Sequence, residues 1–288
     1  MQFISKEPIN RGFSRDKKYC AVTADGEKYL LRTSPKERYN AKKHEFEMMQ
    51  MAAKTGVPIC TPIEFGECDE GVYTVLSWID GVCAEEFLPT VCEKDAYALG
   101  IESGEILKKL HTIPAPDTAS DWQKRFIEKS EYKIGMYKNC GVRFEGDDKM
   151  ISYIRENYHL LEDRPQCFQH DDYHPGNMMI KNQKLIIIDF ERCDFGDPWE
   201  EFDSITWSVD SSPYFAAGMV DGYFEGNVPN RFWQLLALYI CRGVIASVPW
   251  SIPYGEKEVN KILTIAKNVF FNWYDEMKET VPKWYKKV

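Results

Sequence analysis

The sequence contains no C-x-x-C pair, no long apolar run and no low-complexity tract. Its nine cysteines are scattered and odd in number, which favours reduced thiols over a disulfide framework or a zinc site. No apolar stretch is near the roughly 20 residues needed to span a bilayer. The first residues also lack the basic start and apolar core of a signal peptide. The sequence therefore predicts a cytoplasmic protein with no membrane partner.

The balance of charge excludes one further class of partner. The net charge of −9 argues against general binding to nucleic acids and permits a cationic partner. With 288 residues, of which 44% are hydrophobic and 28% charged, the chain can form one large domain or two lobes. The sequence does not distinguish a monomer from a dimer.

The pattern of the first 80 residues predicts a small antiparallel sheet with one helix. Strands are expected at residues 4–13, 19–23, 29–32, 63–66 and 72–78, and the helix at 36–54. Ala24-Asp25-Gly26-Glu27 is typical of a hairpin turn, because glycine accepts a positive φ. Pro58 ends the helix, since it moves Val57 away from helical angles.

After residue 81 the pattern becomes mostly helical. Apolar stripes predict helices at 95–111, 122–138, 149–161, 199–209, 215–224, 231–247 and 256–279. We therefore expect an α+β, bilobal fold. A small antiparallel-sheet N-terminal lobe would occupy residues 1–78 and a larger, mostly helical C-terminal lobe residues 79–288, with a hinge at about 77–81.

One stretch, residues 167–197, carries the candidate chemistry. His170, Asp172 and Asn177 have the spacing H-x-D-x-x-x-x-N, and Asp189 follows twelve residues later at the end of an apolar run. In metal-assisted phosphoryl transfer the protein positions a hydroxyl group and neutralises developing charge. Asp172 would accept the proton of the acceptor hydroxyl. Asn177 and Asp189 would hold Mg²⁺ through hard oxygen ligands.

Each part of this stretch also has a simpler interpretation. The H-x-D-x-x-x-x-N spacing arises by chance in many chains, and Asp189 could be only the cap of a strand. His170 is more typical of a residue that shapes its loop by hydrogen bonding than of one that transfers protons. The combination, with an Asp-Phe pair after an isoleucine run and a turn at residues 181–184 between the two metal candidates, favours phosphoryl transfer.

The same stretch resembles a known family. His170-Asp171-Asp172-Tyr173-His174-Pro175-Gly176-Asn177 and Ile188-Asp189-Phe190-Glu191 are similar to the central motifs of the aminoglycoside phosphotransferases. Gly196-Asp197-Pro198 with Asp203, and Leu107-Lys108-Lys109-Leu110-His111, resemble two further elements of that family. The resemblance covers most of the chain, strongly in the middle and loosely at both ends. It implies a protein-kinase-like fold, shared with choline kinases, and an enzyme that uses Mg²⁺ and ATP or GTP.

In the N-terminal lobe the resemblance implies nucleotide-binding residues. Arg32 stands where the family has the strand cation that grips the α- and β-phosphates. That cation is usually lysine, so the arginine is a departure with a different geometry. Glu45 resembles the helix glutamate that pairs with the cation, and Glu47 is the competing candidate. The simpler interpretation is that Arg32 is a solvated residue at the end of a strand.

The resemblance also implies a turn over the phosphates and a hinge beside the base. Gly12-Phe13-Ser14 would be the turn, with Ser14 and backbone amides as donors. The Ser77 carbonyl and the Ile79 amide would bond the adenine edge, and such backbone contacts do not distinguish ATP from GTP. The absence of G-x-G-x-x-G argues against a eukaryote-type protein kinase. Glu191 stands in place of the glycine of Asp-Phe-Gly, which argues against a flipping switch there.

The segment 193–230 bears on the acceptor. It contains eight carboxylates and several aromatic residues but no lysine or arginine. If it lines the substrate cleft, its carboxylates would bind ammonium groups and its aromatic faces would add cation–π attraction. Alternatively, half of these carboxylates lie on solvated helix faces and Asp203 braces the catalytic loop.

Three functions remain open. The first is a kinase of an aminoglycoside-type or other cationic antibiotic. The second is a metabolic kinase of choline, an amino alcohol, a sugar or a macrolide. The third is a pseudokinase that binds nucleotide without turnover, against which the intact Asp172, Asn177 and Asp189 argue. We expect a Mg²⁺-dependent small-molecule kinase, with the antibiotic substrate ahead of the metabolic ones.

Overall fold

The chain forms two compact units that do not correspond to two halves of the sequence. The structure is a computed structural model and describes residues 1–10 and 16–286. The first unit combines Met1–Phe87 with Gly176–Cys193, and the second combines Leu88–Pro175 with the chain from Asp194 onward. A five-stranded antiparallel sheet together with many helices confirms the expected α+β fold.

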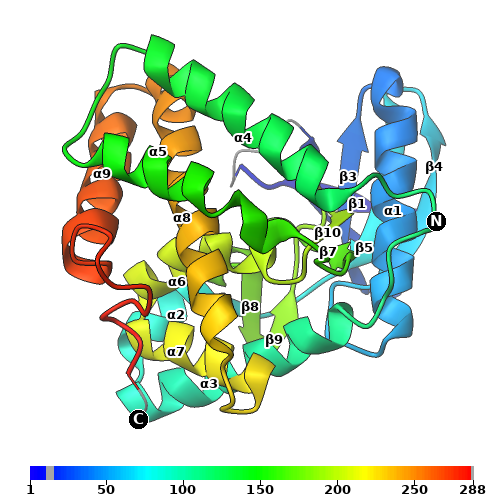
Figure 1. Ribbon diagram of the computed structural model, residues 1–288. Helices are drawn as coiled ribbons and strands as arrows, with labels where there is room; N and C mark the ends of the chain where they lie inside the picture. Colours follow the sequence, from blue (N-terminus) through cyan, green and yellow to red (C-terminus); the bar gives the residue numbers. More distant parts are fainter. Residues whose placement is uncertain (11–15, 287–288) are drawn as a thin grey trace. The chain divides into compact units, whose positions relative to one another are not determined.

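An antiparallel sheet and one long helix build most of the first unit. The sheet has the strand order β1-β2-β3-β5-β4. Its strands are β1 (Ser5–Pro8), β2 (Lys17–Val22), β3 (Lys28–Ser34), β4 (Pro62–Cys68) and β5 (Gly71–Ser77). Helix α1 (Tyr39–Lys54), preceded by the 3₁₀ turn η1 (Lys36–Arg38), packs on β4 and β5 (Figure 1). Its buried apolar residues Phe46, Met49 and Ala52 recur at the three-to-four spacing of one helix face.

A second sheet brings a distant segment into the first unit. Its strand order is β6-β8-β9. The short helix α2 directly follows β6 along the chain. The elements are β6 (Val82–Cys83), α2 (Ala84–Phe87), β8 (Met178–Lys181) and β9 (Lys184–Ile187). The Ile187 amide donates to the Pro58 carbonyl at 2.9 Å, and the Ile187 carbonyl accepts from the Cys60 amide at 3.1 Å. These bonds place the hairpin with the first unit, whereas the sequence interpretation assigned residues 79–288 to one second lobe.

Helices dominate the second unit. They are α3 (Glu93–Leu110), α4 (Trp122–Asn139), α5 (Asp147–Glu156), α6 (Ile205–Ser211), α7 (Pro213–Phe224), α8 (Asn230–Ser251) and α9 (Glu256–Lys267). Strands β7 (Cys167–Gln169) and β10 (Asp194–Gly196) form a small antiparallel pair. Shorter turns are η2 (Leu88–Thr90), η3 (Tyr158–Leu161), η5 (Glu200–Ser204), η6 (Ile252–Tyr254) and the π-helical η7 (Asn268–Trp273). The chain passes from the second unit to the first within η4 (Pro175–Asn177).

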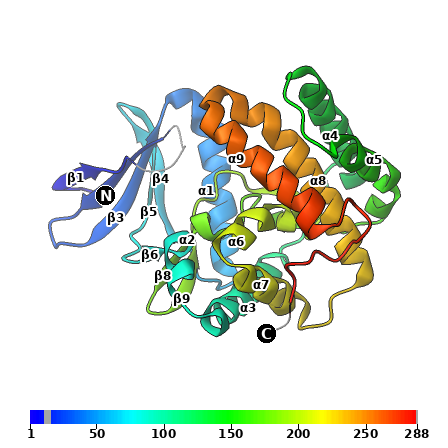
Figure 2. The ribbon, with the colours of Figure 1, turned by 90° about the vertical axis from the view of Figure 1, so that its left-hand side faces the viewer.

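Helix α8 is the core helix of the second unit. It packs against α4, α5 and α9 (Figure 2), and its Leu235 and Tyr239 share an apolar cluster with Trp122 of α4. Within the described residues, Asn230–Tyr254 is the one helix long and apolar enough to cross a membrane, and 67% of its most apolar window is buried inside the protein. Such burial is typical of a helix that is apolar because it lies in a core.

Helices α3 and α7 approach each other closely because glycines face glycines. Gly100 and Gly104 of α3 meet Gly218 and Gly222 of α7. A Cβ at Gly104 would lie 2.2 Å from the carbonyl oxygen of Met219. Small residues four apart let two helix backbones come into direct contact, so these glycines set the distance between the two helices.

Most helices and strands expected from the sequence are confirmed, with some differences. The helix expected at 149–161 is α5 followed by η3, and the one expected at 199–209 begins as η5 and continues as α6. The strand expected at 4–13 ends at Pro8, and residues 11–15 lie outside the described part. The helix expected at 256–279 ends at Lys267, because η7 and a run of positive φ values at Asp275, Glu276 and Met277 follow it. The short elements β6, β7, β10 and α2 were not predicted, since two to four residues are too few to show a period.

Candidate active site

The two expected metal ligands lie at the same end of the β8–β9 hairpin. Asn177 directly precedes β8, and Asp189 follows β9 by two residues. The Ile188 amide donates to the Asn177 carbonyl at 3.0 Å, which extends the ladder to the level of both side chains. The turn residues Asn182 and Gln183 have φ values of 52° and 60°, as a tight two-residue hairpin requires. The sequence therefore places an amide and a carboxylate together through local structure.

The donor atoms at this end of the hairpin fit Mg²⁺. Asp189 has a φ of 65°, and its side chain is 33% exposed. A carboxylate and an amide oxygen are hard ligands, and Mg²⁺ in nucleotide sites takes its remaining ligands from phosphates and water. Among residues 1–10 and 16–286 no group of three or more His, Cys, Asp or Glu side chains could hold a metal ion. A metal at Asn177 and Asp189 would therefore depend on oxygen atoms from the nucleotide.

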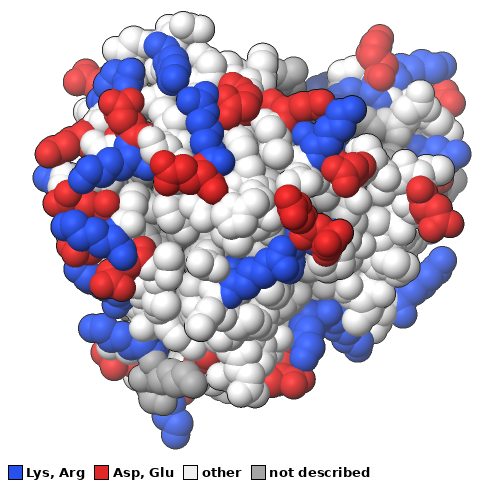
Figure 3. All heavy atoms as spheres, viewed as in Figure 1, with Lys and Arg blue, Asp and Glu red and all other residues white. Residues whose placement is uncertain are grey.

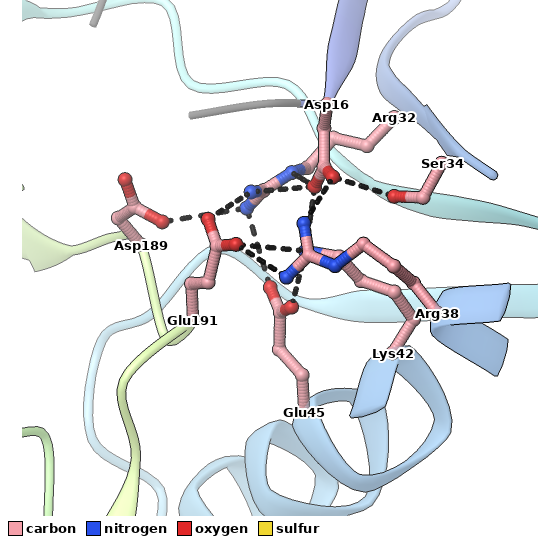
Figure 4. A network of polar contacts seen from close by, with 8 residues as sticks. All are labelled: Asp16, Arg32, Ser34, Arg38, Lys42, Glu45, Asp189 and Glu191. Atoms are coloured by element: carbon pink, nitrogen blue, oxygen red, sulfur yellow. Dashed lines mark hydrogen bonds and ion pairs between the residues drawn. The ribbon is translucent and has the colours of Figure 1, made fainter. Parts of the chain in front are cut away.

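Arg32 lies at the centre of a buried ionic network in the first unit (Figure 4). Its Nη1 lies 3.3 Å from Glu45 Oε1 and 3.4 Å from Asp189 Oδ1, and its Nη2 lies 3.2 Å from Glu191 Oε2. Only 6% of the Arg32 side chain is exposed, so the interpretation of Arg32 as a solvated strand end does not hold. Glu45, and not the exposed Glu47, reaches this guanidinium.

Three residues that the sequence analysis did not select complete this network: Asp16, Arg38 and Lys42. Burial alone would raise the pKa of Asp16, but Arg32 and Lys42 lower it below the usual value. Likewise, burial opposes the shift at Glu191, whose pKa is lowered by Arg38, Lys42 and Arg32. Both carboxylates are therefore ionised at neutral pH. The spacing of Lys42 and Glu45 on one helix face was a usable signal, whereas nothing local marks Asp16.

Of the residues expected to contact the base and the phosphates from the hinge and the turn, Ser77 and Ile79 are described by the structure and Ser14 is not. Ser77 ends β5, where its amide donates to the Thr61 carbonyl at 2.9 Å and its hydroxyl accepts from the Thr61 amide at 2.8 Å. Ile79 follows in a stretch without regular structure. Ser14 lies outside the described residues. The nucleotide roles of these three residues stay predictions.

The loop that carries the expected base lies in the second unit. The His170 side chain is fully buried, and its amide donates to Glu201 Oε2 at 2.6 Å. The Asp172 side chain is 30% exposed, and its Oδ1 lies 3.7 Å from His174 Nε2. Asp171, between them, has a φ of 58°. This geometry presents Asp172 to solvent and suits His170 to shaping the loop.

Two carboxylates of the segment that follows the hairpin are buried, and one of them, Glu201, contacts this loop. Burial raises the pKa of Glu201, the partner of the His170 amide, to about 8. Asp197 accepts from Arg164 Nε at 2.7 Å and from Arg164 Nη2 at 2.8 Å, and the Tyr239 hydroxyl donates to it at 2.5 Å. Asp197 belongs to a motif that resembles the family, whereas no motif marks Glu201.

Most carboxylates of the acidic segment 193–230 are engaged inside the second unit. The contacts are Asp194–Arg125 at 3.1 Å, Asp197–Arg164 at 2.7 Å, Asp203–Arg242 at 3.6 Å, Asp221–Tyr97 at 2.7 Å, Glu225–Lys108 at 2.7 Å and the pair Glu200–Arg242. The Arg164 guanidinium carbon lies over the Trp199 ring, 3.7 Å from the ring centroid. The segment therefore offers fewer available carboxylates to a cationic acceptor than its composition indicates.

Comparisons with known proteins show the family and the fold of this chain. The phosphotransferase enzyme family matches residues 6–233. Wild-type aminoglycoside 2'-phosphotransferase-IIIa in its GDP complex is 14% identical with a TM-score of 0.69, covering 93% of each chain. A choline/ethanolamine kinase family protein from Mesorhizobium loti is 14% identical with a TM-score of 0.68, covering 96% of this chain and 91% of that one.

A third similar structure is the amicoumacin kinase hAmiN in complex with AMP-PNP, Ca²⁺ and Ami. It is 12% identical with a TM-score of 0.66, and the match covers 96% of this chain and 90% of that one. At these identities the structures show a shared fold. No curated protein sequence matches the chain. The family match spans more than three quarters of the sequence and confirms the resemblance of its central motifs. The chain therefore belongs to the phosphotransferase enzyme family and is a phosphotransferase that acts on a hydroxyl acceptor.

Proposed function

We propose that the protein is a Mg²⁺-dependent kinase that transfers the γ-phosphoryl group of ATP or GTP to a hydroxyl group of a small molecule. The observation that carries this proposal is the hairpin end that holds Asn177 and Asp189, with Arg32 Nη1 3.4 Å from the Asp189 carboxylate. Hard oxygen ligands and a fixed cation are the groups that phosphoryl transfer requires of a protein.

Asp172 would serve as the base. The acceptor oxygen attacks the γ-phosphorus, the bond from that phosphorus to the β–γ bridging oxygen breaks, and the nucleoside diphosphate leaves. The hydroxyl proton passes to the Asp172 carboxylate, whose position matters more than its basicity. Mg²⁺ held by Asn177 and Asp189 would neutralise charge on the phosphates. His170 would keep the loop in place through the bond of its amide to Glu201.

The nucleotide would be held by residues of the first unit. Arg32, kept in place by Glu45, would bind the α- and β-phosphates, with Ser14 donating from the preceding turn. The Ser77 carbonyl and the Ile79 amide would bond the base. Similar structures contain GDP in one case and AMP-PNP in another, so both ATP and GTP are candidate donors.

The acceptor we propose is an aminoglycoside-type or other cationic antibiotic. The similar aminoglycoside and amicoumacin kinases support this class. A metabolic kinase of choline, an amino alcohol, a sugar or a macrolide is the alternative, and the similar choline/ethanolamine kinase family protein supports it. Most carboxylates of the segment 193–230 pair with residues of the second unit. This pairing weakens the argument for a polycationic acceptor, because paired carboxylates are less available to bind its ammonium groups.

A reaction in the cytoplasm fits the composition. All nine cysteines lie within the described residues, and each of them is a free thiol. Acidic and basic side chains are interspersed over the described residues of the face shown in Figure 3. Together with the net charge of −9, this supports small-molecule partners in preference to a nucleic acid.

A nucleoside-diphosphate release assay tests the proposal. Purified protein is incubated with Mg²⁺ and ATP or GTP against aminoglycosides, other amine-bearing antibiotics, macrolides, choline, amino alcohols and sugars. We expect acceptor-dependent release with one class. A response to choline-like compounds alone would make the antibiotic assignment wrong, and no release with any acceptor despite tight nucleotide binding would favour the pseudokinase.

Two matched variants assign the base. Asp172→Asn should abolish acceptor-dependent release while the affinity for the nucleotide changes little, because the side chain keeps its shape but cannot accept the proton. Asp163→Asn is the control, because Asp163 is an exposed aspartate outside the proposed site. Normal turnover in Asp172→Asn would refute the role of this residue.

A further inference from the structure

Asp16 holds the Arg32 guanidinium more closely than Glu45 does. Asp16 Oδ2 accepts from Arg32 Nε at 3.1 Å and lies 2.9 Å from Nη2, whereas Glu45 Oε1 lies 3.3 Å from Nη1. The side chain of Asp16 is completely buried, and that of Arg32 is 6% exposed. One carboxylate therefore fixes the Nε side of the guanidinium, and a second fixes its Nη1 side.

Asp16 is itself fixed by several donors (Figure 4). The Ser34 hydroxyl donates to Oδ1 at 2.5 Å, and Arg38 Nη1 donates to the same oxygen at 3.1 Å. Lys42 Nζ lies 2.6 Å from Oδ2. Burial would raise the pKa of Asp16, but Arg32 and Lys42 lower it, so the carboxylate stays ionised. A buried carboxylate with donors on both oxygens is held in one orientation.

In the orientation set by Asp16 and Glu45, both Nη atoms of Arg32 also contact residues at and after the end of the hairpin with the proposed metal ligand. Arg32 Nη1 lies 3.4 Å from Asp189 Oδ1, and Nη2 lies 3.2 Å from Glu191 Oε2. A lysine at position 32 would be a point charge without an Nε–H, and Asp16 could not set its orientation in this way. The orienting effect of Asp16 therefore depends on having an arginine at position 32.

Lys42 offsets part of the negative charge around Arg32. Asp16 and Glu45 together would more than neutralise Arg32 and weaken its attraction for an anion. Lys42 Nζ lies 2.6 Å from Asp16 and 2.7 Å from Glu45, and its side chain is 4% exposed. Four carboxylates surround Arg32, namely those of Asp16, Glu45, Asp189 and Glu191, and Lys42 and Arg38 each offset one of them.

We propose that Asp16 is a positioning residue for the nucleotide: it sets the orientation in which Arg32 meets the phosphates, and Lys42 supplies part of the compensating charge. This inference rests on the proposed nucleotide-binding function. It assigns to Asp16, a residue without any motif around it, a larger share in phosphate binding than to Glu45.

Calorimetry with MgADP and MgGDP tests the inference, using whichever the wild-type protein binds. Asp16→Asn should raise the Kd about tenfold or more, because the amide is a much weaker partner for a guanidinium. In an Arg32→Lys background the same Asp16→Asn change should alter the Kd by less than about threefold, since the orientation to be lost is already absent. Glu45→Gln in the wild-type background should raise the Kd less than Asp16→Asn does.

Asp147→Asn is the matched control for a buried, ion-paired aspartate. Asp147 lies in the second unit, pairs with Arg143 and accepts from the Tyr137 hydroxyl at 2.6 Å. Its substitution should lower the melting temperature and leave the Kd unchanged. If Asp16→Asn does not fold, Ser34→Ala replaces it in the test, because it removes one donor to Asp16. This variant should also raise the Kd, by a smaller factor.

The outcomes separate the two proposals. An unchanged Kd in Asp16→Asn, or an equal change with arginine and with lysine at position 32, would overturn the role of Asp16 while leaving the kinase function in place. Wild-type protein that binds neither MgADP nor MgGDP would overturn the proposed function and the inference together.

Discussion

Replacing Gly104 with alanine should destabilise the second unit, although alanine is the better helix former. The added Cβ would lie 2.2 Å from the Met219 carbonyl oxygen and 2.5 Å from the Tyr223 amide nitrogen. Both are backbone atoms of α7, so no side chain can rotate away to make room. Helices α3 and α7 would have to separate by about 1 Å to restore ordinary contact, and a close-packed interface resists such a change.

The magnitude follows from two opposing effects. Alanine gains about 1 kcal/mol over glycine from helix propensity. Overpacking costs about 1–3 kcal/mol and sometimes more, and a clash between two backbones belongs at or above the upper end of that range. We expect a net loss of about 2 kcal/mol, which corresponds to a fall in melting temperature of roughly 4–8 °C for a unit of this size.

Thermal unfolding followed by circular dichroism measures this loss. The control is Gly135→Ala in α4, where an added Cβ would have no neighbouring atom within 4 Å. That substitution should raise the melting temperature, because it gains about 0.5–1 kcal/mol of helix propensity without a clash. A Gly104→Ala protein that melts at or above the wild type would refute the packing argument.

Three other predictions concern buried carboxyl groups and the metal. Burial raises the pKa of Glu201 from 4.5 to about 8, so its protonated form stabilises the fold below about pH 4.5 and this contribution is lost as the pH rises toward 8. Glu201→Gln should therefore show a smaller fall in melting temperature between about pH 5 and pH 8, and an equal fall in both proteins would contradict this. Asp197→Asn should cost about 3–5 kcal/mol in urea unfolding, because it leaves the buried Arg164 guanidinium without its carboxylate; a cost below about 1 kcal/mol would show that the pair is not needed. Asp189→Asn should reduce the difference between the Kd values for ADP measured by calorimetry with and without Mg²⁺. An unchanged difference would show that Asp189 does not bind the metal.

Local patterns were sufficient for much of the fold and for part of the candidate site. Helix α1 was predictable because its apolar residues recur on one face, and the sheet because short apolar runs alternate with turns. Asn177 and Asp189 were predictable as a pair because a tight hairpin joins them, so their spacing along the chain fixes their spacing in the fold. Their roles in binding a metal stay predictions.

Most of the ionic network could not be predicted, because its contacts join separate elements of the fold. Asp16 meets Arg32 across two strands, and Glu191 reaches the same guanidinium from a hairpin more than 150 residues away. Composition does not show which charged residues pair with one another. The acidic segment 193–230 suggested a cationic ligand, but most of its carboxylates have partners within the second unit. Ion pairs between distant residues depend on the tertiary fold, and a charged residue carries no mark of its future partner.

The discontinuity of the first unit has a consequence for its synthesis. Residues 1–87 leave the ribosome long before residues 176–193, and at about 5–20 residues per second the delay is roughly 5 to 20 seconds. During that interval strand β6 and the carbonyl of Pro58 lack the hairpin that later bonds to them. Unpaired strand edges recruit other chains, so the nascent N-terminal segment is where we expect a holdase chaperone to bind. For the same reason a fragment cut after residue 87 should aggregate unless the hairpin is supplied.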